Sequence, residues 1–170
     1  MSKAPFVVIA LAALAAPPAA AHVTLERRQA PVGSYYKAVF AVPHGCAGSP
    51  TVKLRVQIPE GVIGIKPMPK AGWTVETVKG KYATEYDFHG SKLSEGVKEV
   101  VWSGGKLADD NYDEFVLNTF LTGSLKPGTT LYFPVVQECE QGISRWIEIP
   151  QGDKHEGKSP APGVKLLPKP

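Results

Sequence analysis

Apolar and polar residues alternate in short runs along most of the chain after residue 21. Tyr35–Val42 (YYKAVFAV) and Val52–Ile58 (VKLRVQI) show this pattern most clearly, and both are rich in aromatic and β-branched residues. Such alternation is typical of β-strands with one buried face. The same pattern predicts further strands at His22–Arg27, Ile63–Lys66, Thr74–Lys79, Tyr82–Phe88, Val97–Trp102, Glu114–Leu121, Thr130–Gln137 and Arg145–Ile149.

Glycine- and proline-containing turns separate these runs at intervals of about 8–12 residues, which is typical of an antiparallel β-sandwich. No segment has a sustained helical period, and only Leu107–Asp113 is expected to form a short helical turn. Residues 151–170 contain many Lys, Pro, Gly and Ser residues and few large apolar ones, so we expect a flexible C-terminal tail. The sequence therefore predicts an all-β fold with one sandwich domain over residues 22–150.

The first 21 residues have a different composition and resemble a secretory signal peptide. Lys3 supplies a positive charge, Phe6–Leu14 forms an apolar core, and three alanines ending at Ala21 provide a small-residue cleavage site. We expect cleavage after Ala21 and export to the periplasm. No later stretch approaches the roughly 20 apolar residues of a membrane-spanning helix, so the processed chain is expected to be soluble. We also expect it to be a monomer.

The charge pattern argues against nucleic acid as a partner. The formal net charge is +3, and the basic residues are scattered among acidic ones instead of forming a continuous patch.

The chain has two cysteines, Cys46 and Cys139. An even number of cysteines in an exported protein favours a disulfide, and a thiolate copper site is the alternative. A bond across 93 residues would stabilise the fold by about 4–5 kcal/mol in the chain-entropy model.

Cleavage after Ala21 would make His22 the first residue of the processed protein. Its α-amine and its imidazole Nδ1 can then chelate one metal ion together, an arrangement called a histidine brace. The α-amine has a reference pKa of roughly 8, so a metal displaces its proton readily near neutral pH. Nitrogen donors of this kind favour Cu(II) among the common divalent ions.

Hairpin counting brings further candidate residues towards His22. Folding the chain about the turn near Pro31 places His22 opposite residue 41 or 42, with His44 just beyond. A second turn near Gly142 places Cys139 opposite residues 144–146, so Trp146 is expected beside the disulfide. His22, His44, Trp146 and the disulfide are therefore predicted to form one cluster, although strand register can slip.

Each candidate has a plainer interpretation. His44 lies in a loop where many histidines only contact water, and an indole such as Trp146 is more often part of the core. Glu26 and Glu114 could donate oxygen ligands or could simply face solvent. Four other residues are expected to play no part in the site: Trp73 and Trp102, which we expect to pack in the core, and His89 and His155, which we expect to be solvated.

Several segments resemble the YcnI-like DUF1775 family of exported copper-binding proteins. They are AHVTLE, VPHGCAGSPTVKLRVQIPEGV, PMPKAGWTVE, VVWSGGKL and LYFPVVQECEQGISRWIEIP, which together cover most of residues 22–150. The resemblance implies a cupredoxin- or immunoglobulin-like sandwich with one Cu(II) held by a brace at His22, near Trp146. Gram-positive members of the family carry a glutamate in the loop where this chain has His44, so His44 or Glu114 is expected to take its place.

The leading hypothesis is a periplasmic Cu(II)-binding protein, without enzymatic activity, that serves copper delivery, buffering or resistance. No Ser-His-Asp or Cys-His nucleophile pattern and no phosphate-binding glycine loop is present in the sequence. One alternative is a copper-dependent oxidase of the lytic monooxygenase type, with His44 as a second imidazole. Another is a β-sandwich interaction module whose metal binding is incidental.

Overall fold

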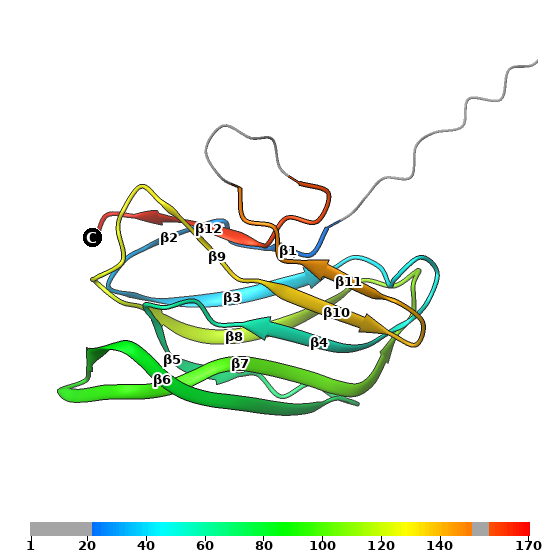
Figure 1. Cartoon of the computed structure of the whole chain (residues 1–170), viewed down its shortest axis with the longest axis horizontal. Helices are drawn as coiled ribbons and strands as arrows, with labels where there is room; N and C mark the ends of the chain where they lie inside the picture. The colour runs from blue at the N-terminus through cyan, green and yellow to red at the C-terminus, as the bar shows by residue number, and fades with distance from the viewer. Residues whose placement is uncertain (1–21, 151–156) are drawn as a thin grey trace, which may run out of the picture.

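The computed structural model describes residues 22–150 and 157–170, and the predicted signal peptide lies outside this range. The described residues form an all-β fold with no helix. Figure 1 shows β2, β12 and β9 along the upper side of the molecule and the long β6–β7 ribbon along the lower side. The predicted β-sandwich is confirmed, whereas Leu107–Asp113, expected to be helical, ends one strand and turns into the next.

The first sheet has four strands in the order β1-β3-β8-β5. Its strands are β1 (Thr24–Leu25), β3 (Ser34–Val42), β5 (Val62–Pro67) and β8 (Asp113–Leu121). Phe40 and Phe115 pair across β3 and β8 and are both fully buried. Because side chains alternate along a strand, their neighbours Ala41 and Glu114 point to the opposite face of the sheet.

The second sheet has five strands in the order β11-β10-β4-β7-β6. Its strands are β4 (Thr51–Gln57), β6 (Thr74–Phe88), β7 (Ser91–Leu107), β10 (Val135–Cys139) and β11 (Ile143–Trp146). The separate strands predicted within 74–88 are one continuous strand, because the ladder passes through register shifts near Lys79 and Lys81. The single strand predicted over 130–137 is instead divided, with its second part beginning after Pro134.

A third, smaller sheet has the order β2-β12-β9. Its strands are β2 (Gln29–Pro31), β9 (Thr130–Tyr132) and β12 (Gly163–Leu167). The expectation of a flexible tail is wrong for this segment: β12 pairs with β2 in parallel and with β9 in antiparallel orientation, and it buries Val164 and Leu166. The overall composition of residues 151–170 is polar, but Val164 and Leu166 stand two positions apart, which is the spacing of inward-facing residues on a strand. Residues 151–156, the other part of the predicted tail, lie outside the described range.

One hydrophobic core joins the three sheets. It includes Phe40 and Phe115 from the first sheet, Leu54 and Trp102 from the second, and Leu166 from the third. Burying an aliphatic or aromatic side chain of this size stabilises a fold by about 1.5–3 kcal/mol. Within residues 22–150 and 157–170 there is no helix of the length and hydrophobicity that crossing a bilayer requires.

Candidate functional site

His22 lies just before β1, at the edge of the core. Val23 and Leu25 are almost fully buried, at 1% and 2% exposure, and anchor this end of the chain. Because the chain is extended here, His22 and Thr24 lie on the other side of the chain from the inward-pointing Val23 and Leu25. The position of His22 is therefore fixed by the residue that follows it.

The imidazole of His22 meets the indole of Trp146. Their ring centroids are 5.4 Å apart and the planes make an angle of 60°, an edge-to-face contact. Trp146 is 7% exposed and stands at the end of β11. Edge-to-face ring pairs are favourable in themselves, so this contact helps to hold the His22 ring in place.

Gln137 ties the indole to the loop that carries His44. Its Oε1 accepts a hydrogen bond from Trp146 Nε1 at 3.0 Å, and its Nε2 donates to the His44 carbonyl oxygen and to Thr51 Oγ1, both at 2.7 Å. Gln137 is 1% exposed, and both its amide oxygen and its amide nitrogen form hydrogen bonds. Sequence reasoning missed this residue, although it stands between the inward-facing Val135 and Cys139 on a strand.

His44 lies in the loop between β3 and β4. Its Nδ1 is 2.6 Å from the Gly45 carbonyl oxygen. A carbonyl only accepts hydrogen bonds, so this contact places a proton on Nδ1 and makes Nε2 the nitrogen suited to a metal. The structure thus links the His44 backbone to Trp146 through Gln137, and it brings His22 into direct contact with Trp146.

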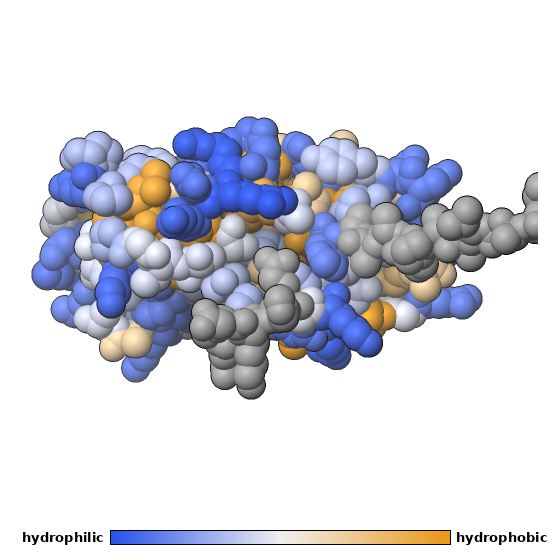
Figure 2. Space-filling view, turned by 90° about the horizontal axis from the view of Figure 1, so that it is seen from above, coloured by the Kyte–Doolittle hydropathy of each residue, from blue (hydrophilic) through white to orange (hydrophobic). Residues whose placement is uncertain are grey.

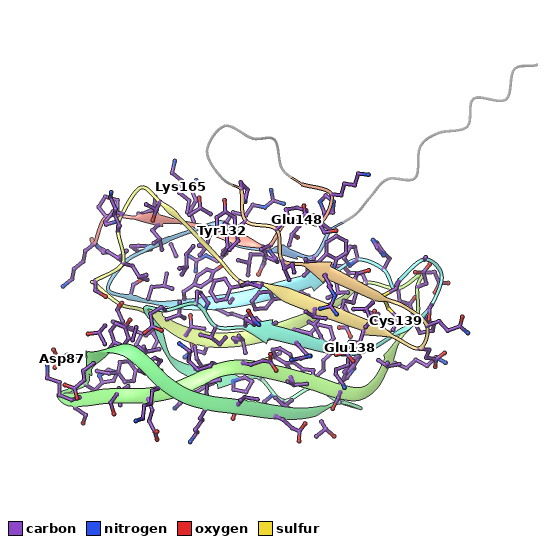
Figure 3. All side chains as sticks on the ribbon, in the orientation of Figure 1. Asp87, Tyr132, Glu138, Cys139, Glu148 and Lys165 are labelled. Atoms are coloured by element: carbon purple, nitrogen blue, oxygen red, sulfur yellow. A yellow bond between two sulfur atoms is a disulfide. The ribbon has the colours of Figure 1, made fainter. Side chains whose placement is uncertain are left out.

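The predicted disulfide is confirmed. Cys46 and Cys139 are bonded with a Cα–Cα distance of 6.0 Å, and the bond lies at the end of the sandwich where β10 turns into β11 (Figure 3). It fastens the His44 loop to β10, the strand that also carries Gln137.

Two details of the predicted register are wrong. Thr24 pairs with Ala41, so continuing this register places His22 opposite Pro43, one residue beyond the expected partner. Cys139 lies opposite Gly142, whose carbonyl accepts its N–H, while Trp146 pairs with Val135. Gly142 has a φ of 91°, which allows a tight turn that simple counting did not anticipate. Trp146 still reaches the site because its side chain extends to Gln137.

The structure gives Glu114, one of the two acidic candidates, a partner other than His22. Glu114 lies opposite Ala41, on the outer face of the first sheet, and its carboxylate accepts a hydrogen bond from Tyr112. That bond, with some burial and the nearby charge of Glu26, raises the pKa of Tyr112 to about 12. Among the described residues, no group of three or more His, Cys, Asp or Glu side chains is arranged to hold a metal.

The other residues expected to stand apart from the site are placed as follows. Trp102 is fully buried and Trp73 packs against the core. His89 is exposed, as expected, and its Nε2 lies 2.7 Å from the hydroxyl of Tyr35. His155 lies outside the described residues.

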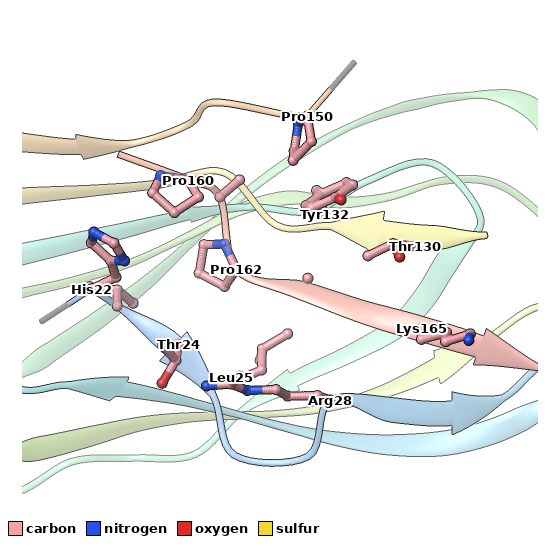
Figure 4. Close-up of a pocket in the computed structure, with 13 residues that line it drawn as sticks. His22, Thr24, Leu25, Arg28, Thr130, Tyr132, Pro150, Pro160, Pro162 and Lys165 are labelled. Carbon is pink, nitrogen blue, oxygen red and sulfur yellow. The ribbon is translucent and has the colours of Figure 1, made fainter. Parts of the chain in front are cut away.

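A pocket of about 420 Å³ begins at His22. Figure 4 shows His22 at one end, Lys165 at the other, and Tyr132 and Pro160 on the opposite wall from Arg28. The sequence analysis did not anticipate this pocket, because it treated β12, which forms part of the pocket floor, as a flexible tail. The alternation of Val164 and Leu166 in the sequence was the signal that could have revealed it.

Residues 22–166 match the family described as "Domain of unknown function (DUF1775)". The chain belongs to the DUF1775 family. The resemblance to DUF1775 inferred from the sequence motifs is thereby confirmed, and the match begins at His22 and includes all of β12 except Leu167.

A solved structure gives independent support for the fold. The crystal structure of an uncharacterized protein from Nocardia farcinica, described as having an immunoglobulin-like fold, is 23% identical to this DUF1775 chain. The similarity covers 86% of this chain and 98% of the other, with a TM-score of 0.64. Among curated proteins, no relative of the chain is found.

Proposed function

We propose that the processed chain, beginning at His22, is a periplasmic protein that binds one Cu(II) for delivery, buffering or resistance. The observation that carries the proposal is the contact between His22 and the indole of Trp146. Gln137 accepts a hydrogen bond from this indole and donates one to the His44 carbonyl oxygen, so it joins the His44 loop to Trp146. A histidine at a predicted cleavage site is thus held by a fixed, largely buried scaffold.

The donor set fits a histidine brace better than a site built from three side chains. No cluster of three His, Cys, Asp or Glu side chains occurs in residues 22–150 or 157–170. A brace needs only one such side chain, because the α-amine of the same residue supplies the second nitrogen. Amine and imidazole nitrogens suit Cu(II), which binds them more strongly than the other common divalent ions.

The neighbouring residues would support copper held at His22. The indole of Trp146 would shield one side of the ion from water and could attract it through its π-face. His44 is our preferred third nitrogen donor, through Nε2, because its loop is fastened next to the indole by the disulfide. Glu26 and Glu114 are the alternative oxygen donors.

The disulfide also supports export, since disulfides persist in oxidising compartments such as the bacterial periplasm. In that setting, a site near a chain terminus is suited to passing copper to another protein. We therefore propose binding and transfer of copper as the role of the chain, without catalysis.

The test is a Cu(II) titration followed by EPR on two proteins. One begins at His22, and the other carries a single extra glycine before His22. The glycine leaves the imidazole in place but moves the free amine away, so only a terminal brace should be affected. We expect one nitrogen-rich copper per chain in the first protein and a weakened or altered site in the second.

Substitutions separate the contributing residues. His22→Ala should abolish tight binding, whereas His89→Ala serves as a matched control and should leave it unchanged. His44→Ala should alter the EPR parameters if its imidazole is a ligand. Identical spectra with and without the added glycine, or full affinity in His22→Ala, would refute the site.

A further inference from the structure

The pocket that begins at His22 has an uneven charge distribution. Arg28 and Lys165 lie among its lining residues, together with the hydroxyl-bearing Thr130 and Tyr132, and the described lining residues include no Asp or Glu. Neither cation forms an ion pair with a described residue. Glu148, on the segment leading to Pro150, accepts a hydrogen bond from the Ser159 N–H instead.

Strand pairing holds these groups side by side. Lys165 on β12 pairs with Thr130 on β9, and its N–H donates to the Arg28 carbonyl oxygen at 2.8 Å. Val164 and Leu166 point into the core, so alternation directs Lys165 outwards. Both positive side chains line the pocket, and no acidic residue occurs on β2, β9 or β12.

Gly163 keeps the floor of this pocket open. It pairs with Tyr132, and a Cβ added to it would lie 2.8 Å from the Thr130 methyl group and 3.0–3.1 Å from the Tyr132 ring. A larger residue here would occupy the space between the two side chains that carry hydroxyl groups. Figure 2 looks down on this side of the molecule and shows strongly hydrophilic residues bordering apolar ones.

We infer that this pocket binds a small organic polycarboxylate. The carboxylates would be held by Arg28 and Lys165 and accept hydrogen bonds from the hydroxyls of Thr130 and Tyr132. Arginine and lysine form charge-assisted hydrogen bonds with carboxylates, and these bonds are the strongest contacts that such a site offers. The apolar rim, which includes Pro160 and Pro162, would contact the carbon skeleton of the ligand.

A pocket of this size suits a small molecule better than a macromolecular surface. Its volume of about 420 Å³ lies within the usual range for small-molecule sites. The inference is independent of copper, because every group that would hold the anion belongs to the metal-free chain.

The test is an NMR titration of the metal-free, ¹⁵N-labelled chain beginning at His22 with citrate and with succinate. We expect saturable shifts concentrated at Arg28, Thr130 and Lys165, and none with succinamide, the neutral analogue of succinate. The double variant Arg28→Gln/Lys165→Gln should raise the citrate dissociation constant by at least about tenfold. Because both side chains are exposed, this variant should remain folded, as its thermal unfolding will show.

The matched control is Arg145→Gln/Lys37→Gln, which removes the same two charges from exposed positions on β11 and β3. It should change the dissociation constant less than about twofold. The inference is overturned if citrate gives no saturable shift up to about 20 mM. It is also overturned if both double variants weaken binding equally, or if anionic lipid vesicles bind this face while citrate does not.

Discussion

Gln137→Leu provides a direct test of the network beneath the candidate site. Leucine is similar in size to glutamine but offers no hydrogen-bond donor or acceptor. The substitution would remove the acceptor for Trp146 Nε1 and the donor for the His44 carbonyl oxygen, now at 3.0 and 2.7 Å. Thr51 would also lose its partner, but its hydroxyl already lies 3.8 Å from Cys139 Sγ and can turn towards it.

The expected loss of stability follows from the two groups that lose their hydrogen bond to Gln137, Trp146 Nε1–H and the His44 carbonyl oxygen. A buried donor or acceptor without a partner costs about 1–3 kcal/mol, and two such groups remain after the substitution. The apolar side chain of leucine offsets roughly 1–2 kcal/mol of this by its burial. With the middle of each range, about 4 kcal/mol lost and about 1.5 kcal/mol regained, the free energy of unfolding should fall by about 2.5 kcal/mol, a large share of the total stability of an ordinary domain.

The assay is urea unfolding followed by circular dichroism, with the indole N–H resonance of Trp146 as a local probe. Gln57→Leu is the matched control, because it is the same substitution at an exposed position on β4 and should change stability by less than about 0.5 kcal/mol. A loss below about 1 kcal/mol in Gln137→Leu, with an unchanged indole resonance, would refute the reasoning. That outcome would mean that Gln137 does not hold Trp146 and the His44 loop together.

Two further predictions concern stability. Replacing Cys46 and Cys139 by alanine should lower the free energy of unfolding by about 4–5 kcal/mol, because their bond spans 93 residues. Urea unfolding measures this free energy, and an unchanged value would contradict the prediction. Burial raises the pKa of Glu60, but hydrogen bonds from Lys98, Tyr86 and the Ala83 N–H outweigh it and hold this pKa below its ordinary value. The resulting stability is present above the ordinary glutamate pKa and is lost as the pH falls through the lowered one. Unfolding across this acidic range should thus be less pH-dependent in Glu60→Gln, and equal pH slopes would contradict the prediction.

Alternation predicted the fold well because most strands bury one face. Tyr35–Val42 and Glu114–Leu121 lie within one residue of β3 and β8. It divided β6 wrongly because Gly80 and Lys81 interrupt the pattern, while in the structure a register shift carries the ladder through. It missed β12 because a short strand buried between two others needs only a few apolar residues.

The sequence predicted which candidate residues lie near one another, but not the contacts between them. Counting along two hairpins placed His22, His44 and Trp146 at one end of the sandwich, since hairpin geometry is local. The contacts depend on one-residue offsets, such as the tight turn at Gly142, and on the hydrogen-bond partners of Gln137. The alternation of Gln137 with Val135 and Cys139 indicates that it faces inwards but does not give its partners. Side-chain hydrogen bonds of this kind become visible only once the sheet register is known.

Segments from near both ends of the described chain line the same pocket. β1 contacts β12, and the pocket takes His22 from one end of the chain and Lys165 from the other. β12 is held between β2 and β9, which lie far apart in the sequence, so the small sheet depends on all three segments being in place. The copper site proposed at His22 draws on Trp146, Gln137 and the His44 loop, whereas the proposed anion pocket is lined by residues of β9 and β12. The two proposed sites therefore depend on different strands of the same sandwich.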